Sequence, residues 1–560
     1  MKKLLLTLVT FVGLTLQSQA QFFEKVDYAG ALSSELSKDW TKGWTEWNPK
    51  TSIYADVTDT TTFCSSTGKV EITGTLVLDA SKVYLLKSLV VVRMGGRLIV
   101  PAGTSIRALA DATSSPKQYA TIVVERGGWI AVNGTSSSPV VFTSAKAVGS
   151  RDRGDWGGLV LCGNAVNNQG PNIQMEGFNN IALDNALAKH GGTNDADNSC
   201  NINYLRIEFG GYAFEPNKEI NGLTMASVGN GSLIDHVQVS YSGDDSYEWF
   251  GGTVNCKHII AYKGTDDDFD TDFGYRGGVQ FGIGYKDSAY FDLSWNSTGG
   301  STSEGFESDN DASGSGRLPL TAAIFSNMTM VGPVPVGMSW SQLSTTSKGA
   351  FRRGVRIRRN SRLSIINSIF MGYRNFVMFD GDSVLTNSGV KSKTISDKND
   401  LFRYNYIYSV KSSAPKGATN TGLAEISAGG NVLLLDSWIR NSYNANTIDT
   451  NVGTYPPLIN TTTQLNFRPT HPFLTSYLFE ILNPFGVYSK VFIVKKQSSI
   501  AYPNPTNEGI NIRPCSYRLV NSNGAVVAEG NNSYIDTKNF SNGVYYLMTS
   551  NGVETIIVQH

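Results

Sequence analysis

The sequence predicts an all-β protein, a right-handed parallel β-helix followed by a small antiparallel β-sandwich. Three observations lead to this fold class. Short runs of Val, Ile, Leu, Phe and Tyr, separated by Gly, Asn and Ser, fill residues 67–490 without sustained helical periodicity. Several of these runs align with one another. Residues 497–560 then change to β-rich runs joined by Asn-Gly turns.

Size and composition agree with this division. The 560 residues exceed one compact core and leave room for two or three domains. Lys plus Arg and Asp plus Glu are equal at 47 each, so we expect no nucleic-acid partner. Aromatic residues at 11% exclude wholesale disorder.

Residues 1–20 have the pattern of a signal peptide. Two lysines precede an apolar run that is too short to span a bilayer, and a small-x-small site predicts cleavage between Ala20 and Gln21. No second apolar run predicts a transmembrane segment, and no Cys follows the cleavage site to carry a lipid. We therefore expect a secreted protein.

Residues 21–66 read as an irregular lead-in or cap. Trp40, Trp44 and Trp47 share one helical face by spacing, but the glycine and proline nearby favour a turn. These tryptophans are expected to cover the open end of the following core. The alternative is an aromatic platform on which sugars stack.

Residues 67–490 are predicted to form the β-helix. Residues 202–209 align without a gap with residues 234–241, and the segments GGRLIVPAG (95–103) and GGWIAVNG (127–134) form a second pair. Stacked coils of such repeats bury a continuous apolar column that one coil alone cannot bury. A propeller or a β-sandwich is the alternative, although a propeller needs more uniform repeats. The spacings predict roughly 13 to 19 coils.

Residues 497–560 are predicted to be a separate antiparallel unit. Strands are expected at residues 509–513, 517–520, 525–528 and 544–547, with a turn at Asn523-Gly524. A unit of this size holds a small core between two sheets.

This tail resembles the C-terminal type A sorting domain of proteins that the type IX secretion system of Bacteroidota exports. The resemblance rests on YPNP, which contains Pro503, Asn504 and Pro505, on YRLVNSNGAVV (517–527) and on NFSNGVYYL, which contains Gly543. It implies that the secretion machinery is a partner. It also implies that the protein crosses the periplasm and is then secreted or held on the outer cell surface.

The middle of the chain resembles large β-helical surface proteins of the same bacteria, of the pectin-lyase-like type, which have no established activity. The segments that carry this resemblance are GDWGGLVLCGNA (154–165), 203–224, 237–282, GFESDNDA (305–312) and 358–373. The resemblance brings no catalytic residues.

Acidic residues form the strongest chemical pattern. DDSYEWFG (244–251) aligns with DDFDTDFG (267–274), which would stack carboxylates about 5 Å apart in successive coils. Hard oxygen ligands in such an array suit Ca²⁺, although the spacing is not that of an EF-hand. The candidate calcium ligands are Asp244, Asp245, Glu248, Asp267, Asp268, Asp270 and Asp272. Asp266 belongs to the same acidic run, and Glu307, Asp309 and Asp311 could add a third layer. The alternatives are a ladder that caps turns and pairs with basic side chains, and a catalytic site.

A basic stretch provides the other candidate site. Arg356 and Arg358 should share one face of a strand, with Arg359 on the opposite face. They are candidates for a groove that binds an anionic polysaccharide, and the alternative is a solvated rim or pairing with the acids. Five scattered cysteines and five histidines form no zinc motif, disulfide scaffold or catalytic triad.

The sequence thus predicts a secreted or surface protein that binds glycan or another surface component. One alternative is a Ca²⁺-dependent polysaccharide lyase or a glycoside hydrolase. The other is a purely structural surface protein. Whether the protein is an enzyme stays open, and the pattern assigns no catalytic residue.

Overall fold

A computed structural model describes most of the chain. The described residues are 22–54, 60–65, 68–111, 120–178, 187–212, 220–292, 301–334, 340–388, 390, 402–408, 420–427, 431–440, 446–449, 467–468, 501–502, 508–512, 516–521, 526–531, 533–549 and 552–558. The predicted signal peptide, with Ala20 and Gln21, lies outside them, as do Pro503, Asn504 and Pro505. The chain divides into two compact units, one formed by most of residues 28–473 and the other chiefly by residues 487–560.

One long sheet of the first unit contains one strand from every coil. Its eleven parallel strands are β2 (Lys69–Ile72), β5 (Leu89–Val92), β8 (Thr121–Val124), β11 (Gly158–Cys162), β15 (Leu223–Val228), β17 (Tyr247–Gly252), β19 (Phe269–Asp272), β21 (Phe306–Ser308), β23 (Arg353–Arg358), β26 (Asn375–Asp380) and β29 (Ala424–Ile426). They pair in the order in which they follow along the chain.

The second long sheet contains seventeen described strands. They are β1 (Thr60–Cys64), β3 (Thr75–Val77), β4 (Val83–Leu86), β6 (Arg97–Pro101), β7 (Ser105–Ala108), β9 (Trp129–Asn133), β10 (Val140–Ser144), β14 (Cys200–Glu208), β16 (Leu233–Ser240), β18 (Asn255–Tyr262), β20 (Gly278–Tyr285), β22 (Ile324–Val331), β24 (Ser364–Ile366), β25 (Ile369–Met371), β27 (Phe402–Arg403), β28 (Tyr406–Tyr408) and β30 (Thr447–Asp449).

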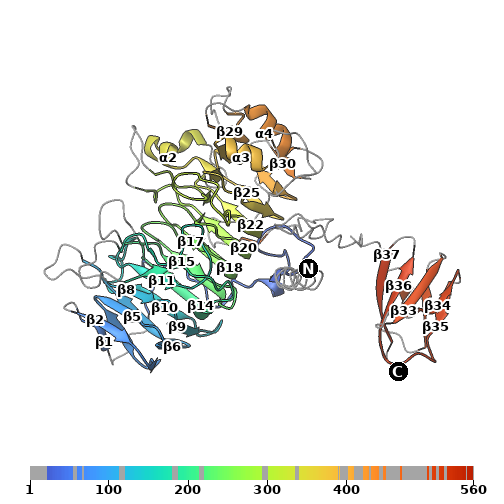
Figure 1. The fold of residues 1–560 in the computed structure, drawn as a ribbon, viewed down its shortest axis with the longest axis horizontal. Coiled ribbons are helices and arrows are strands. Elements are labelled where there is room, and N and C mark those ends of the chain that lie inside the picture. The colour runs from blue at the N-terminus through green and yellow to red at the C-terminus, as the bar shows by residue number, and fades with distance from the viewer. Residues whose placement is uncertain are drawn as a thin grey trace, which may run out of the picture. The chain divides into compact units, whose positions relative to one another are not determined.

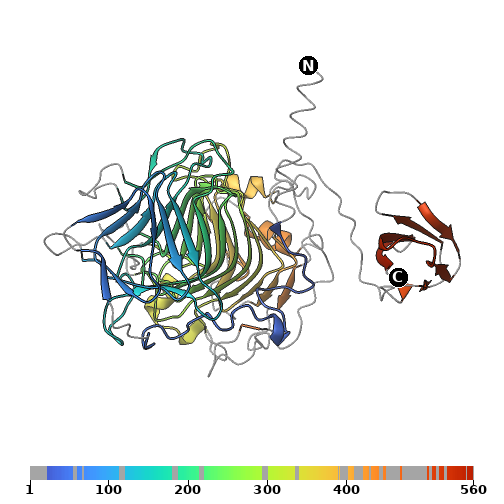
Figure 2. The ribbon, with the colours of Figure 1, turned by 90° about the horizontal axis from the view of Figure 1, so that it is seen from below.

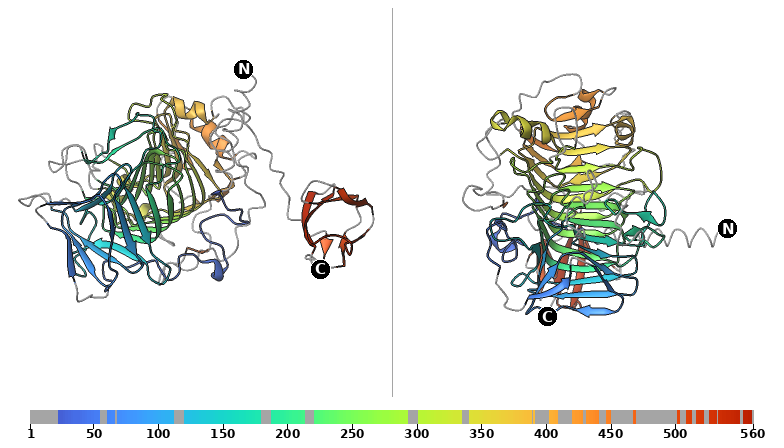
Figure 3. Two further views of the ribbon diagram at one scale, coloured as in Figure 1. Left: turned by 60° about the horizontal axis from the view of Figure 1, so that its bottom comes forward. Right: turned by 90° about the vertical axis from the view of Figure 1, so that its left-hand side faces the viewer.

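The coils stack into a parallel β-helix, as predicted, and the propeller and sandwich alternatives for this unit are wrong (Figures 1 and 3). Like residues stack along its interior: the rings of Tyr247, Phe269 and Phe306 follow one another at centroid distances of 5.6 and 5.2 Å. The described strands make eleven coils, fewer than the predicted 13 to 19. Outward insertions lengthen several coils, and one of them holds the antiparallel pair β12 (Ile173–Gln174) and β13 (Lys189–His190).

Helices are few among the described residues and lie in the connections or near the last coils. They are the 3₁₀ helices η1 (Leu36–Lys38) and η2 (Trp340–Gln342) and the α-helices α2 (Thr345–Ala350), α3 (Asp382–Asn387) and α4 (Val432–Ile439). The last α-helix adds Leu435 and Trp438 to the apolar interior beside the final coils.

The lead-in runs across the outer face of the seventeen-stranded sheet (Figure 2). Trp44 is buried against Tyr204 of β14, and Trp40 and Trp47 are half-buried against rings of β16 and β18. The indole nitrogens of Trp40 and Trp44 donate to backbone carbonyls at 2.8 and 2.7 Å. The tryptophans therefore cover the side of the middle coils and not the open end.

The second unit has two antiparallel sheets around one core. One contains β31 (Ala501–Tyr502), β32 (Gly509–Ile512) and β35 (Tyr534–Asp536). The other contains β33 (Tyr517–Asn521), β34 (Val526–Gly530), β36 (Gly543–Thr549) and β37 (Gly552–Val558). Ile510 of the first sheet and Leu519 and Leu547 of the second are buried in the same apolar cluster. The predicted small sandwich is confirmed.

Cys64, Cys162, Cys200 and Cys256 are buried free thiols, and Cys515 lies outside the described residues. No helix within the described part of the chain is long and apolar enough to cross a membrane.

Candidate functional site

Carboxylates of two successive coils meet on the outer side of the eleven-stranded sheet. Glu248 of β17 pairs in register with Asp270 of β19, because these neighbouring strands run parallel. Oxygen atoms of Asp245, Glu248 and Asp270 lie within 4.8 Å of one another, and so do those of Asp244, Asp245 and Asp266. The two groups share Asp245. We call these five residues the acid cluster.

Carboxylate side chains also link the turns that precede successive strands of this sheet, by hydrogen bonds to backbone N–H groups. Asp245 Oδ1 accepts a hydrogen bond from the Asp267 backbone N–H at 2.7 Å. Asp267 Oδ1 accepts from the Glu304 N–H at 2.5 Å, and Glu304 Oε2 accepts from the Arg353 N–H at 2.7 Å. Each carboxylate thus caps the turn of the next coil. The predicted turn-capping ladder exists, and Asp245 belongs to both the ladder and the acid cluster.

Ionisation of the acid cluster is unfavourable because its carboxyl groups are buried next to one another. Burial raises the pKa of Asp245 well above its usual range, and the neighbouring Asp244 and Asp267 raise it further. Burial and Asp270 act in the same way on the pKa of Glu248. Burial likewise raises the pKa of Asp266. Such a group needs protons, a cation or basic partners to be stable.

Several predicted calcium ligands lie elsewhere. Asp268 points into the core, where its Oδ1 lies 3.2 Å from Lys286 Nζ and both side chains are fully buried. Asp267 is used in the turn-capping ladder. Asp272 accepts from the Phe273 N–H at 2.6 Å, and burial followed by the charge of Asp309 raises its pKa to about 8. Asp266 takes their place in the cluster, although the predicted ligand set did not include it.

The predicted arginine groove is instead an ion-pair network, which we call the arginine cluster: Glu307, Asp309, Arg356, Arg358 and Arg359. Arg356 Nη1 lies 3.3 Å from Glu307 Oε1, and its Nη2 lies 3.1 Å from Asp380 Oδ2. Arg358 Nε lies 2.7 Å from Asp309 Oδ1, and Arg358 also contacts Glu307. These arginines pair with acids of the preceding and the following coil, as the alternative of pairing with the acids predicted.

Strand alternation predicted that Arg359 faces away from Arg358, but the two side chains lie on the same side. β23 ends at Arg358, and Arg359 adopts a left-handed backbone conformation with φ of 50°. Its guanidinium Nη1 therefore returns to the same side and lies 2.8 Å from Asp309 Oδ2.

A third cluster of metal-ligand residue types lies under the lead-in. Nδ1 of His236 and Nδ1 of His258 lie 2.8 and 2.7 Å from the same oxygen of Asp235. The two imidazole rings are stacked, with centroids 4.3 Å apart and planes 24° apart. This cluster is a hydrogen-bonded packing element, as expected for a lone strand histidine such as His236.

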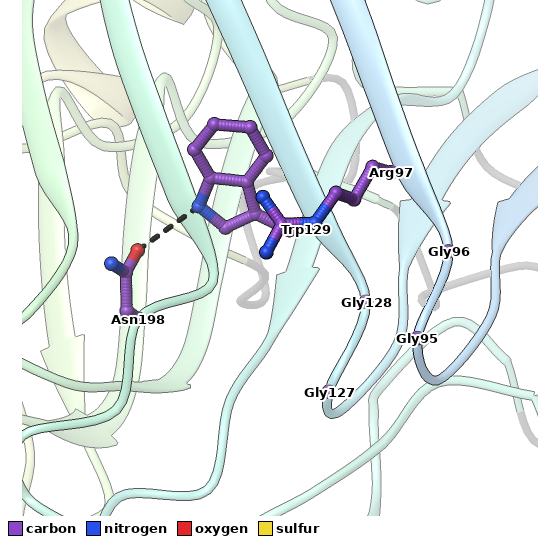
Figure 4. A pocket seen from close by; sticks show the side chains of 7 residues that line it. All are labelled: Gly95, Gly96, Arg97, Gly127, Gly128, Trp129 and Asn198. Carbon is purple, nitrogen blue, oxygen red and sulfur yellow. Dashed lines mark hydrogen bonds between the residues drawn. The ribbon is translucent and has the colours of Figure 1, made fainter. Parts of the chain in front are cut away.

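A hollow of about 340 Å³ opens on the seventeen-stranded sheet in the early coils (Figure 4). Arg97 of β6 and Trp129 of β9 are register partners, and the guanidinium carbon lies 5.0 Å from the centroid of the indole. The Trp129 indole N–H donates to Asn198 Oδ1 at 3.1 Å. Cation, aromatic ring and amide thus stand next to one another.

Glycine pairs form the rim of this hollow. A Cβ atom on Gly96 would lie 1.9 Å from the Ile72 carbonyl oxygen, and one on Gly128 would lie 2.4 Å from that of Val92. Only glycine permits this close stacking of turns. The repeated Gly-Gly pairs of the sequence mark the site, but the sequence analysis used them only as a sign of repetition.

Comparisons with known proteins follow the same two units. Residues 70–441 match the family described as pectate-lyase like beta helix domain, and residues 500–559 match the secretion system C-terminal sorting domain. No curated protein matches the chain.

Two solved structures of the catalytic domain of a GH87 α-1,3-glucanase are similar at 10% identity. The complex with nigerose has a TM-score of 0.20, covering 72% of this chain and 70% of that chain. The D1068A variant with tetrasaccharides has a TM-score of 0.15, covering 67% and 65%. Neither likeness bears on the activity of this chain.

Proposed function

The chain belongs to the pectate-lyase-like β-helix family and ends in a secretion sorting domain, and we propose that the exported protein binds an extended glycan. The sorting domain directs export through the type IX secretion system, so the β-helix acts at the cell surface or outside the cell. In this proposal the binding surface is the outer face of the early coils, around the hollow at Trp129.

The hollow is the observation that carries the proposal. Trp129 is half-buried and offers an apolar ring edge and face, the kind of surface on which the C–H side of a sugar packs. Arg97 and Asn198 are exposed beside it. Within the described residues, neither the Arg97 guanidinium nor the Asn198 amide nitrogen donates a hydrogen bond to the protein, so both are available for sugar hydroxyl or carboxylate oxygens.

The surface beside the hollow favours an extended ligand. Register places Asn133 of β9 next to Asn203 of β14, and Asn203 next to Asp235 of β16. Asn203 Nδ2 donates to Asn201 Oδ1 at 2.9 Å, which forms a short row of outward amides. Neighbouring strands lie about 4.8 Å apart, so this face repeats polar groups along the coil axis.

The enzyme alternatives have weaker support. A lyase requires a basic side chain that is free to remove a proton, whereas Arg356, Arg358 and Arg359 are held in ion pairs. The acid cluster offers several carboxylates with raised pKa values, which is also a property of glycosidases. Cleavage of a bound glycan in the experiment below would favour a hydrolase or lyase over simple binding.

The test is a binding screen of the purified mature chain against neutral and acidic polysaccharides, followed by titration calorimetry on the best ligand. We expect Trp129→Ala to weaken binding about tenfold, which equals about 1.4 kcal/mol. Asn198→Ala should have a smaller effect, because it removes one hydrogen-bonding group.

Leu433→Ala is the matched control, since Leu433 is 67% exposed on α4 and remote from the early coils in sequence. It should leave the dissociation constant unchanged. If the chain binds no polysaccharide, or if Trp129→Ala binds as tightly as the unchanged protein, the proposal fails. The purely structural role is then the better account.

A further inference from the structure

Most of the acid cluster is not balanced by basic side chains. Within the described residues, no Lys or Arg lies within ion-pair distance of four of its members: Asp245, Glu248, Asp266 and Asp270. The buried ammonium group of Lys286 pairs with Asp268 on the interior side of the turn, and it contacts the backbone carbonyl of Asp266 but not the Asp266 carboxylate. The arginines begin only with β23, two coils after β19, and they face Glu307 and Asp309.

Some carboxylate oxygens of the cluster are buried without any hydrogen-bond partner. The Asp266 side chain accepts one hydrogen bond through Oδ2, from Ser301 Oγ at 2.6 Å. Its Oδ1 has none, although Asp266 is only 9% exposed. Asp270 Oδ1 is buried and unpartnered too. A buried, unpaired carboxylate oxygen is costly, so these oxygens indicate a ligand that supplies positive charge.

We propose that the acid cluster binds Ca²⁺ where the chain passes from a turn into β17 and, one coil later, from a turn into β19. All of its donors are carboxylate oxygens, the ligands that hard cations prefer, and it has no imidazole or thiolate to favour zinc. Asn221, whose amide contacts Glu248, adds a neutral polar group at the edge. Several carboxylates at irregular positions suit the variable geometry of Ca²⁺ better than the strict octahedron of Mg²⁺.

In this position the ion joins two coils. Asp245 and Glu248 come from one coil, and Asp266 and Asp270 come from the next. The cation therefore replaces the arginines that perform the same task two coils later. The proposal is independent of glycan binding, because the hollow at Trp129 belongs to the seventeen-stranded sheet of earlier coils.

The experiment measures thermal unfolding and calcium binding of the mature full-length chain after treatment with a chelator. Adding Ca²⁺ at a hundredfold excess over its dissociation constant should raise the melting temperature by a few degrees. Calorimetry should give one or two ions per chain. Na⁺ at equal ionic strength should not reproduce the shift, and a shift that Na⁺ reproduces would overturn the proposal, because it would reflect screening alone.

Asp270→Asn tests the location of the site. It keeps the size of the side chain and removes a charge, and it should abolish most of the Ca²⁺-dependent shift. Asp309→Asn is the matched control from the same face of the sheet: it should lower the melting temperature but keep the response to Ca²⁺, since Asp309 faces arginines. An Asp270→Asn protein that responds like the unchanged chain contradicts the proposal.

A second measurement covers the case in which Asp270→Asn does not fold. Crystals of the unchanged chain grown with Ca²⁺ should show a strong density peak between Asp245, Glu248 and Asp270. Crystals that hold only water at this position would refute the site.

Discussion

The acid cluster and the arginine cluster lie on the same face of one sheet, two coils apart, and treat buried carboxylates in opposite ways. In the arginine cluster, Glu307 stacks in register with Arg356, and burial is offset by a network of ion pairs. In the acid cluster, Glu248 stacks in register with Asp270, so like charges repel. Both clusters bury carboxylates, and what differs is the identity of the register partner of each carboxylate.

This difference shows how a β-helix determines which charged side chains become neighbours. Parallel in-register stacking brings residues of successive coils to within about 5 Å, whatever their separation in sequence. A carboxylate is stabilised when the next coil carries an arginine at that position. It needs a proton or a cation when the next coil carries another carboxylate.

The largest loss of stability should come from breaking the buried ion pair between Arg353 and Glu304, which lies at the start of the strand that carries the arginine cluster. Arg353 is 4% exposed, and its guanidinium binds Glu304, which is fully buried, at 2.8 Å and Glu425 at 2.7 Å. Arg353→Met would leave the Glu304 charge buried without its partner. We expect a loss of about 3–5 kcal/mol in the free energy of unfolding, measured by denaturant titration.

The double variant Arg353→Met with Glu304→Leu serves as the control. Because it removes both charges, it should recover much of the loss. If Arg353→Met costs less than about 1 kcal/mol, an exposed-pair value, then buried pairing is not what stabilises this side of the comparison.

A third way to bury an ionisable group is to keep it neutral, and His190 provides the test. It is fully buried, its Nδ1 lies 2.9 Å from Ser227 Oγ, and burial lowers its pKa to about 3. The unfolded chain binds a proton near the usual pKa of 6.5, and the folded chain does not. The stability contributed by His190 is therefore complete above pH 6.5 and is lost as the pH falls from there toward 3.

We expect His190→Leu to flatten this part of the pH profile. Between pH 6.5 and 4.5 the unchanged protein should lose about 2 kcal/mol more than the variant, as measured by denaturant titration at each pH. Parallel profiles for the two proteins would show that His190 is protonated, or is not buried, in the folded state.

The smallest effect should come from the exposed edge of the arginine cluster. The Arg359 side chain is 40% exposed while it contacts Asp309 at 2.8 Å. Arg359→Met should therefore cost under about 1 kcal/mol, because solvent screens the pair and Arg358 still faces Asp309. High salt should reduce the difference between variant and unchanged protein. A cost as large as that of Arg353→Met would mean that exposure does not set the strength of these pairs.

Much of the fold could be predicted from local pattern. Gap-free alignment of residues 202–209 with 234–241 reflects real register partners, since Ile202 pairs with Ile234 and Ile207 with Val239. In the second unit, the strands predicted from the turn signals at residues 517–520 and 544–547 correspond to β33 and β36. The number of coils could not be predicted, because spacing alone does not separate an outward insertion, such as the one holding β12 and β13, from another coil.

The sequence by itself determined the two-unit plan, the parallel stacking and the concentration of acids near residues 244–272, because alternation, turns and repetition are local properties. Tertiary structure alone decided which side chains meet. Asp268 turns inward to Lys286, and Asn198 reaches Trp129 from another coil. The physical reason is that a turn residue can point to either side of a coil, and that insertions of unequal length set which residues become neighbours across the stack.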